Sequence, residues 1–346
     1  MVEVLIKMDV PRDEAEIVAD VLITADKRGI DSHGIGRFKP IYIDRLDMGI
    51  LNPKTKIDVL RDNQSTAVLD ANNGFGHVAG KYAMDMAIDK AKNYGLGMVT
   101  VKNSSHYGIA GYYTMQATKA GMIGITGTNA RPSIAPTFGV ENMLGTNPLT
   151  FGIPTDEEFD FVLDCATSTT QRGMIEKYAR EGRKLPRGWV IDHMGNSETD
   201  PHKVLKDLVN GDAALTPLGG IGVEMGGHKG YGYATVVEIL SSALHLGPFL
   251  SALTGVDNEG NDIPYRLGHF FIAIDVEHFI ELDKFKKHVG DILRELRNSQ
   301  KAQGHDRIYT AGEKEYITYL DRKDKGAPVN DVLMGQILGL KKRFGI

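Results

Sequence analysis

Two short segments place a histidine beside groups that could hold a small organic acid. In residues 31–37 (DSHGIGR), His33 can carry a proton near neutral pH, and Arg37 offers a planar guanidinium that matches a carboxylate. In residues 103–108 (NSSHYG), small neighbours of His106 leave room for a substrate at the end of an expected strand. The alternative for residues 31–37 is a capped helix start with a surface histidine. The alternative for residues 103–108 is a histidine hydrogen-bonded to the backbone of a turn. If they act together, these groups favour proton transfer next to a bound carboxylate.

Three further segments could bind an anion. Residues 146–148 (TNP) precede an expected strand, and residues 164–170 (DCATSTT) end another with a run of hydroxyls. Residues 226–230 (GGHKG) open an apolar helix, so that backbone N–H groups, the helix dipole and Lys229 could converge on a phosphate. Each segment is weak evidence alone, because a hydroxyl-rich strand end is most often a turn.

Several common sites are missing from the sequence. No G-x-G-x-x-G or G-x-x-x-x-G-K-[ST] motif occurs, which disfavours a Rossmann domain and a P-loop. No H-E-x-x-H or paired Cys/His spacing occurs among the 11 histidines, so no metal site is expected. A dinucleotide that binds this chain must therefore be held by other means.

Composition excludes other classes of protein. Lys and Arg number 40 against 45 Asp and Glu, so the basic excess typical of a nucleic-acid binder is missing. No run of about 18 apolar residues predicts a membrane span, and the first residues lack the apolar core of a signal peptide. Cys165 is the one cysteine, so no intrachain disulfide can form, and a reduced cytoplasm is the expected location.

The elements that must position these residues follow from apolar periodicity and glycine stops. Helices are predicted over 11–28, 36–47, 77–94, 110–120, 203–213, 230–246, 283–300 and 330–340. Strands are predicted over 65–71, 97–101, 121–129, 149–154, 159–166 and 269–279. The helix over 230–246 has few charges and is expected to be buried. The order indicates an α+β fold in which both chain ends (1–64 and 281–346) form a helical module and residues 65–280 form the central cofactor- and substrate-binding region.

Six segments, in order, resemble one family. They read DSHGIGRF (31–38), NSSHYGIAGYY (103–113), SIAPTFGVENMLGTNPLTFGIP (133–154), LDCATST (163–169), GWVIDHMGNSETDP (188–201) and GGHKGYGYATVVEIL (226–240). Together they are similar to the malate/L-lactate dehydrogenases that are unrelated to Rossmann-fold enzymes, a family that includes ureidoglycolate, sulfolactate and diketogulonate oxidoreductases. The missing G-x-G-x-x-G motif agrees with this resemblance.

The resemblance implies a homodimer, with a nicotinamide cofactor on a non-Rossmann mixed or antiparallel sheet flanked by helices and a site near the subunit interface. It makes His106 and His33 the candidate proton donors, and it implies that Arg37, Ser32 and Asn147 bind the substrate. The cofactor contacts that it implies are Asp164, Cys165, Ala166, Thr167, Ser168, Thr169, Thr170, His228, Lys229, Gly312 and Glu313. Directly before Gly312 and Glu313, Ala311 stands where the family pattern has proline.

The expected activity is hydride transfer between NAD, or NADP, and carbon 2 of a 2-hydroxy acid, with malate and oxaloacetate as the first choice. Lactate, sulfolactate and ureidoglycolate are the alternatives within the family. A protein that binds a nucleotide or phosphosugar without redox chemistry is the alternative from another class. His106 is preferred as the proton donor because it follows a strand among small residues, while His33 either orients the substrate or shares the role.

Overall fold

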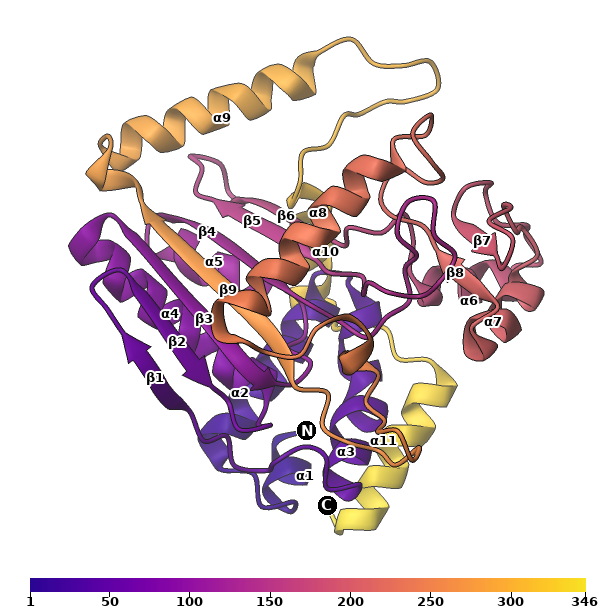
Figure 1. Ribbon diagram of the computed structural model, residues 1–346. Helices are drawn as coiled ribbons and strands as arrows, with labels where there is room; N and C mark the ends of the chain where they lie inside the picture. The colour runs from indigo at the N-terminus through magenta and orange to yellow at the C-terminus, as the bar shows by residue number, and fades with distance from the viewer. The chain divides into compact units, whose positions relative to one another are not determined.

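A mixed seven-stranded sheet runs through the computed structural model, which describes residues 1–346 (Figure 1). Strands β1 and β2 pair antiparallel, whereas β2 and β3 pair parallel with Leu69 opposite Val101. The strand order is β1 (Asp58–Asp62), β2 (Thr66–Asp70), β3 (Leu96–Ser104), β9 (Leu267–Asp275), β4 (Met122–Thr128), β5 (Leu149–Ile153), β6 (Phe161–Cys165). The predicted α+β fold with a mixed sheet flanked by helices is confirmed.

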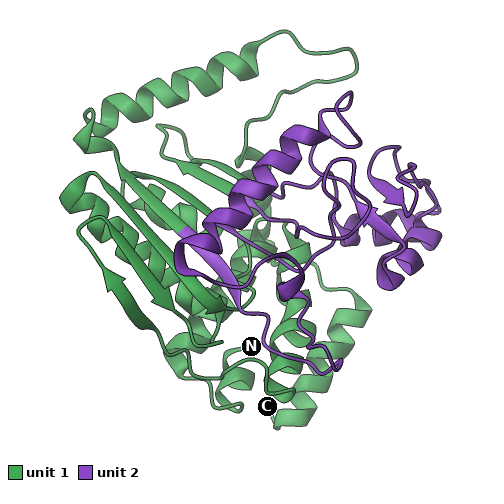
Figure 2. Cartoon of the chain, in the orientation of Figure 1, with its two compact units in different colours: residues 1–126, 150–164, 271–346 green, residues 127–149, 165–270 purple.

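The chain forms two compact units, coloured separately in Figure 2. Unit 1 comprises residues 1–126, 150–164 and 271–346, and unit 2 comprises residues 127–149 and 165–270. Both chain ends belong to unit 1. The expected division into a helical module of the two ends and a central region over 65–280 stays a prediction.

Unit 1 contains most of the sheet and most of the helices. Its helices are α1 (Val2–Ile6), α2 (Arg12–Lys27), α3 (Asp44–Asp47), α4 (Gly76–Tyr94), α5 (Gly111–Lys119), α9 (Leu282–Asn298), α10 (Glu313–Lys325) and α11 (Asp331–Phe344). Helix α4 lies against the sheet through a stripe of alanines, which lets the helix approach Val99 and Val101 closely. A second core joins the chain ends, because Leu340 of α11 packs with Leu5 and Val18.

Unit 2 has its own small core. It contains α6 (Arg172–Arg180), α7 (Pro201–Asn210), α8 (Gly227–Leu240) and a two-stranded antiparallel sheet of β7 (Val190–Asp192) and β8 (Ala213–Leu215). Ile134, Ile175 and Ala234 are buried together in this core. The hydroxyl-rich segment and the Gly-Gly-His-Lys-Gly segment both belong to this unit, apart from Asp164.

The prediction that the helix over 230–246 is buried is wrong. Helix α8 ends at Leu240, and Tyr233, Val236 and Ile239 on it are 56%, 47% and 52% exposed. The low charge of this helix correctly indicated an apolar surface, but one side alone packs on the core through Ala234 and Val237. The apolar composition of a helix does not show which of its sides pack against the rest of the protein.

The helix predicted over 36–47 is irregular. Two 3₁₀ turns, Asp31–His33 and Ile35–Arg37, lead into a π-helix over Phe38–Ile43, and only Asp44–Asp47 is α-helical. Pro40 lacks the N–H that a regular α-helix would use there, which favours a widened turn. Elsewhere, the predicted helices and strands agree with the structure to within a few residues, except that α1, α6, α10, β1, β7 and β8 were not predicted. No helix has the length and apolar content needed to cross a membrane.

Candidate active site

The two histidines singled out from the sequence lie together in unit 1. His33 sits in the turn after α2, and His106 follows β3. Their rings are stacked with centroids 5.7 Å apart and planes 18° apart. Both side chains are partly exposed, and the Ser32 hydroxyl lies 2.9 Å from Nδ1 of His33. The structure therefore brings both candidate proton carriers into one cluster with Ser32.

Two buried residues that the sequence did not single out complete the cluster. The hydroxyl of Tyr42 lies 2.6 Å from Nδ1 of His106, and the Tyr42 ring centroid lies 4.8 Å from that of His77. Both residues are fully buried, and neither ring nitrogen of His77 has a hydrogen-bond partner. In the sequence, Tyr42 has the pattern of a core aromatic residue and His77 that of a helix start, so no local signal marks either one.

Burial sets the charge of this cluster. Desolvation, followed by the nearby Arg37 cation, lowers the pKa of His33 to about 4. Desolvation alone lowers the pKa of His77 to about 3. For His106, desolvation and the neighbouring histidines hold the pKa well below its ordinary value, and burial raises the pKa of Tyr42. At neutral pH the cluster therefore consists of three neutral imidazoles and a protonated phenol.

The turn that carries Ser32, His33 and Arg37 is fixed by α2. Asp26 accepts the Ile35 N–H at 2.8 Å, and a Cβ on Gly34 would overlap the Asp26 carboxylate, so only glycine fits there. Arg322 of α10 pairs with Asp31 and also donates to the Asp26 carbonyl at 2.6 Å. Because these bonds join α2 and α10 to the turn, its backbone is held before any substrate arrives.

The Arg37 guanidinium is hydrogen-bonded within the protein through one of its nitrogens. Its Nε donates to the Ser32 carbonyl at 2.6 Å, and it forms no ion pair in the structure. The side chain is partly buried. A partly buried guanidinium without an acidic partner is well suited to bind an anion from outside, because water compensates its charge only in part.

Three other predicted site residues in unit 1 are already bonded within the protein. Asp164 accepts the Gly111 N–H at 2.7 Å and the Thr150 hydroxyl at 3.1 Å, so it bonds to the start of α5. Glu313 is buried, pairs with Arg307 and accepts the Thr310 N–H at 3.0 Å. Gly312 has a φ of +88°, a conformation that glycine adopts without strain. The structure shows how these residues shape their loops; their contact with a cofactor stays a prediction.

In unit 2, the hydroxyl-rich segment is bonded to its neighbours. Thr167 donates to the Asn147 carbonyl at 2.9 Å, Ser168 to the Thr170 carbonyl at 2.8 Å, and Thr169 to the Pro217 carbonyl at 2.6 Å. Cys165 and Ala166 are partly buried at the start of the segment. Each of these hydroxyls already donates its proton to a backbone carbonyl. A contact with a cofactor would therefore have to involve a hydroxyl oxygen whose proton is already used.

Asn147 is fully engaged as well. Its Nδ2 donates to Glu238 at 2.8 Å and to the Ala234 carbonyl at 3.1 Å, and its Oδ1 accepts the Ala130 N–H at 3.2 Å. The side chain is completely buried. In this structure it ties α8 to the chain before β5, and its role in binding substrate stays a prediction.

The start of α8 is the part of unit 2 that suits an anion. His228 and Lys229 are exposed in its first turn, and that turn contains no acidic residue. A Cβ on Gly227 would overlap the carbonyl of Gly220, so this glycine allows a loop to pass directly against the helix start. The backbone N–H groups of His228 and Lys229 already donate to the carbonyls of Gly222 and Gly226, so the Lys229 side chain and the positive end of the helix dipole are what suits a diphosphate here.

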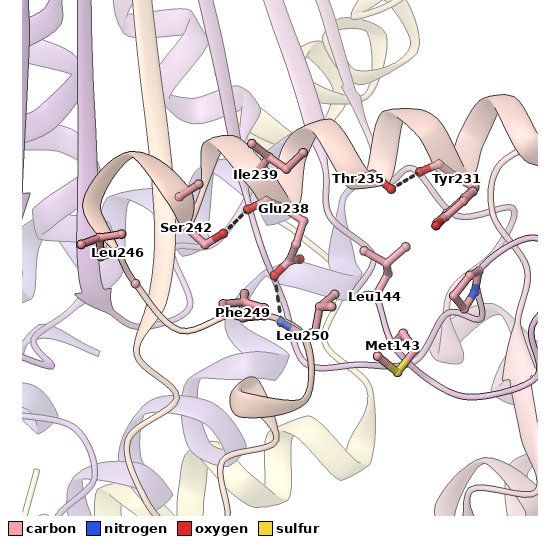
Figure 3. Close-up of a pocket in the computed structure, with 13 residues that line it drawn as sticks. Met143, Leu144, Tyr231, Thr235, Glu238, Ile239, Ser242, Leu246, Phe249 and Leu250 are labelled. Atoms are coloured by element: carbon pink, nitrogen blue, oxygen red, sulfur yellow. Dashed lines mark hydrogen bonds between the residues drawn. The ribbon is translucent and has the colours of Figure 1, made fainter.

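An apolar cavity of about 560 Å³ lies beside the other end of α8 (Figure 3). Leu144, Tyr231, Ile239, Phe249 and Leu250 are among its walls. The one carboxylate there, Glu238, accepts the Leu250 N–H at 3.0 Å, as well as the Asn147 bond. The cavity is large enough for a ring system and offers few polar groups. No group of three or more His, Cys, Asp or Glu residues in the chain could hold a metal ion.

Comparison with known proteins identifies the family. A family model described as malate/L-lactate dehydrogenase matches residues 1–338. The malate dehydrogenase of Pyrococcus horikoshii is 42% identical over 346 residues, covering 100% of this chain and 93% of the relative. The L-sulfolactate dehydrogenase of Methanocaldococcus jannaschii is 39% identical over 349 residues, covering 100% and 95%.

A solved structure agrees with this result. The crystal structure of malate dehydrogenase from Entamoeba histolytica matches with a TM-score of 0.96 at 48% sequence identity, covering 100% of this chain and 95% of that chain. The similarity extends over both units. The chain therefore belongs to the malate/L-lactate dehydrogenase family and is an oxidoreductase of 2-hydroxy acids.

Proposed function

We propose that this chain catalyses reversible hydride transfer between NAD and carbon 2 of malate, which is oxidised to oxaloacetate. The observation that carries the proposal is Arg37, a partly buried cation without an acidic partner, next to the stacked His33 and His106. Malate is the choice among 2-hydroxy acids because relatives with that activity match the whole chain at 42% and 48% identity.

Arg37 is proposed to bind the substrate carboxylate beside carbon 2. Its Nε is occupied by the Ser32 carbonyl, which fixes the plane of the guanidinium. The two terminal nitrogens then form a fork for two parallel bonds to the carboxylate. This two-point contact would set the angle at which carbon 2 faces the cofactor, and that angle controls the rate of hydride transfer.

His106 is proposed to move the proton. When a 2-oxo acid is reduced, the hydride goes to carbon 2 and the carbonyl oxygen takes a proton from Nε2 of the His106 imidazolium. In the oxidation of malate, the neutral ring with its proton on Nδ1 takes that proton back at Nε2. The low pKa of His106 keeps the ring neutral in the free enzyme. A bound dicarboxylate adds negative charge, which favours the imidazolium, so that the ring takes up a proton from water before it donates one to the substrate. His33, stacked on His106, orients the substrate or shares this role.

NAD is the proposed cofactor, with NADP as the alternative. Lys229, His228 and the N-terminus of α8 would hold its diphosphate, and the backbone of residues 164–170 and 312–313 would line the rest. When bound, the nicotinamide supplies or accepts the hydride. The hydroxyls of Thr167 and Thr169 then act by fixing the loop rather than by direct donation, since both already donate to carbonyls.

A homodimer in the cytoplasm is the proposed state of the protein. Exposed apolar side chains of α8 and the following loop, with Ile239 at 52%, Leu246 at 92% and Phe249 at 59% exposure, support self-association. A two-fold contact would cover the same surface on both subunits. The single cysteine, Cys165, agrees with a reducing compartment.

The proposal is tested by following NADH and NADPH absorbance with a panel of 2-oxo acids. The expected result is the fastest oxidation with oxaloacetate. Faster oxidation with sulfopyruvate would assign the chain to sulfolactate, the activity of the 39% identical relative. Binding of NADH, seen as fluorescence quenching, without turnover of any 2-oxo acid would contradict a dehydrogenase and indicate a nucleotide-binding protein.

A further inference from the structure

Two donors converge on one nitrogen of His106. The Tyr42 hydroxyl lies 2.6 Å from Nδ1, and the Gly108 backbone nitrogen lies 3.3 Å from the same atom. A backbone N–H can only donate, so Nδ1 must carry a lone pair rather than a proton. The Tyr42 hydroxyl must therefore donate as well. The neutral ring then holds its proton on Nε2, the other nitrogen.

Tyr42 is well suited to donate to the neutral ring of His106. It is fully buried, and burial raises the pKa of its phenol, so that the hydroxyl stays protonated at any working pH. His106 is the one hydrogen-bond partner of this hydroxyl in the structure. Gly108 has a φ of +78°, and a Cβ there would come within 2.5 Å of Val21, so a larger residue would displace the second donor.

The π-helix explains how Tyr42 reaches His106. Arg37 precedes this segment and Tyr42 lies five residues later. In an α-helix, with about 3.6 residues per turn, two such positions would point about 140° apart. The i→i+5 hydrogen bonds of a π-helix widen the turn and so reduce this angle. Tyr42, near the end of this wide turn, reaches His106, while the Arg37 charge, just before the turn, acts on both histidines and lowers their pKa.

We propose that Tyr42 is a positioning residue of the hydride-transfer reaction, whose hydroxyl bonds Nδ1 of His106, as donor to the neutral ring of the free protein and as acceptor once Nδ1 is protonated, and so keeps Nε2 directed at the substrate oxygen. The proposal rests on the proton-transfer role of His106 given under the proposed function. When His106 takes up a proton from water at Nδ1 and becomes an imidazolium, the Tyr42 hydroxyl rotates and its oxygen accepts the Nδ1–H bond. Nε2 gives its proton to the substrate oxygen, Nδ1 keeps its own, and no proton leaves Tyr42. Phenylalanine fills the same space but can neither donate nor accept.

The test is Tyr42→Phe, with Tyr112→Phe as the matched control. Tyr112 also loses a hydroxyl hydrogen bond, to Asp20 at 2.7 Å, but away from the histidines. In Tyr42→Phe we expect kcat to fall at least about 10-fold, out of the roughly 10²–10⁴-fold that a positioned general acid contributes, with KM for oxaloacetate unchanged. The control is expected to keep the kcat of the unchanged protein.

A spectroscopic readout separates positioning from a general loss of structure. In the unchanged protein at neutral pH, ¹⁵N chemical shifts are expected to show Nδ1 of His106 unprotonated and Nε2 protonated. In Tyr42→Phe, they should show a mixture of both tautomers. A protonated Nδ1 in the unchanged protein overturns the proposal even if the Tyr42→Phe protein does not fold. Unchanged kcat in Tyr42→Phe also overturns the proposal. The His106→Asn variant then shows whether the proton-transfer role of His106 stands. If His106→Asn is inactive, only the positioning role of Tyr42 fails; if it is fully active, the proton-transfer role of His106 fails as well.

Discussion

His33 and His106 come from different parts of the fold, one after α2 and one after β3, yet their rings stack with centroids 5.7 Å apart. Both histidines are partly buried. A partly desolvated imidazole that still reaches the substrate is what a proton carrier in a dehydrogenase requires.

Replacing His106 should damage catalysis rather than binding. In His106→Asn, kcat and kcat/KM are expected to fall together by about 10²–10⁴-fold, because the lost interaction acts mainly in the transition state. NADH binding, followed by fluorescence, should persist, since the proposed cofactor contacts lie elsewhere. If His33→Asn abolishes turnover while His106→Asn only raises KM, the two roles are reversed.

Replacing Arg37 should damage binding first. Arg37→Lys keeps the charge but loses the two-point fork, so KM for oxaloacetate is expected to rise strongly, with a smaller loss of kcat as the substrate angle drifts. Arg12→Lys is the control, because Arg12 is exposed and pairs with Glu3 on the surface. Steady-state kinetics of both variants measure the effect. An unchanged KM in Arg37→Lys would remove Arg37 from the substrate site.

The buried histidines should make folding stability depend on pH. Burial lowers the pKa of His77 to about 3, from an ordinary value of 6.5. Below pH 6.5 the unfolded chain therefore binds a proton at His77 that the folded chain does not bind. Stability is then lost as the pH falls from 6.5 toward 3, at about 1.4 kcal/mol per pH unit for each such proton.

The variant His77→Leu isolates this contribution. Urea unfolding of this variant at pH 7 and pH 5 should show a smaller loss of stability on acidification than the unchanged protein shows. His202→Leu, which removes an exposed histidine from α7, is the control. An equal pH dependence in His77→Leu and the unchanged protein would contradict a neutral, buried His77. The comparison uses the pH dependence, so a general loss of stability in the variant does not affect it.

The apolar surface of α8 should mediate self-association. Light scattering of the unchanged protein at micromolar concentration is expected to give twice the subunit mass. Ile239→Lys, which places a charge on this surface, should shift the protein toward the subunit mass. Val209→Lys on α7, where the valine is 69% exposed, is the matched control. A single subunit mass for the unchanged protein would contradict the dimer.

Regular helices and local motifs could be predicted from the sequence. Helix α4 was predicted because alanines repeat along one side of residues 77–94 and Gly95 ends the helix with a φ of +79°. His33 and Arg37 were singled out because a possible proton carrier stands near a guanidinium that matches a carboxylate, and His106 because small residues surround it after an expected strand. The structure brings the two histidines together, as a shared site requires.

Features that depend on tertiary contacts could not be predicted. The hydroxyl of Tyr42 reaches His106 through a π-helix, and a sequence pattern does not show where the extra residue of a wide turn falls. Asn147 looked available in the sequence, but its three bonds involve segments distant along the chain. Helix α10 was missed because its sequence is rich in charge, and its apolar Ile317 and Leu320 are about 40% exposed.

The most direct test of the central claim is the fate of the transferred hydrogen. The protein is incubated with oxaloacetate and NADH that carries deuterium at both positions of carbon 4 of the nicotinamide, and the malate is examined by proton NMR and mass spectrometry. The account predicts malate with one deuterium, located at carbon 2, and the loss of this product in His106→Asn. Malate without deuterium at carbon 2, or no malate with any reduced nicotinamide, would contradict hydride transfer to a 2-oxo acid as the reaction of this chain.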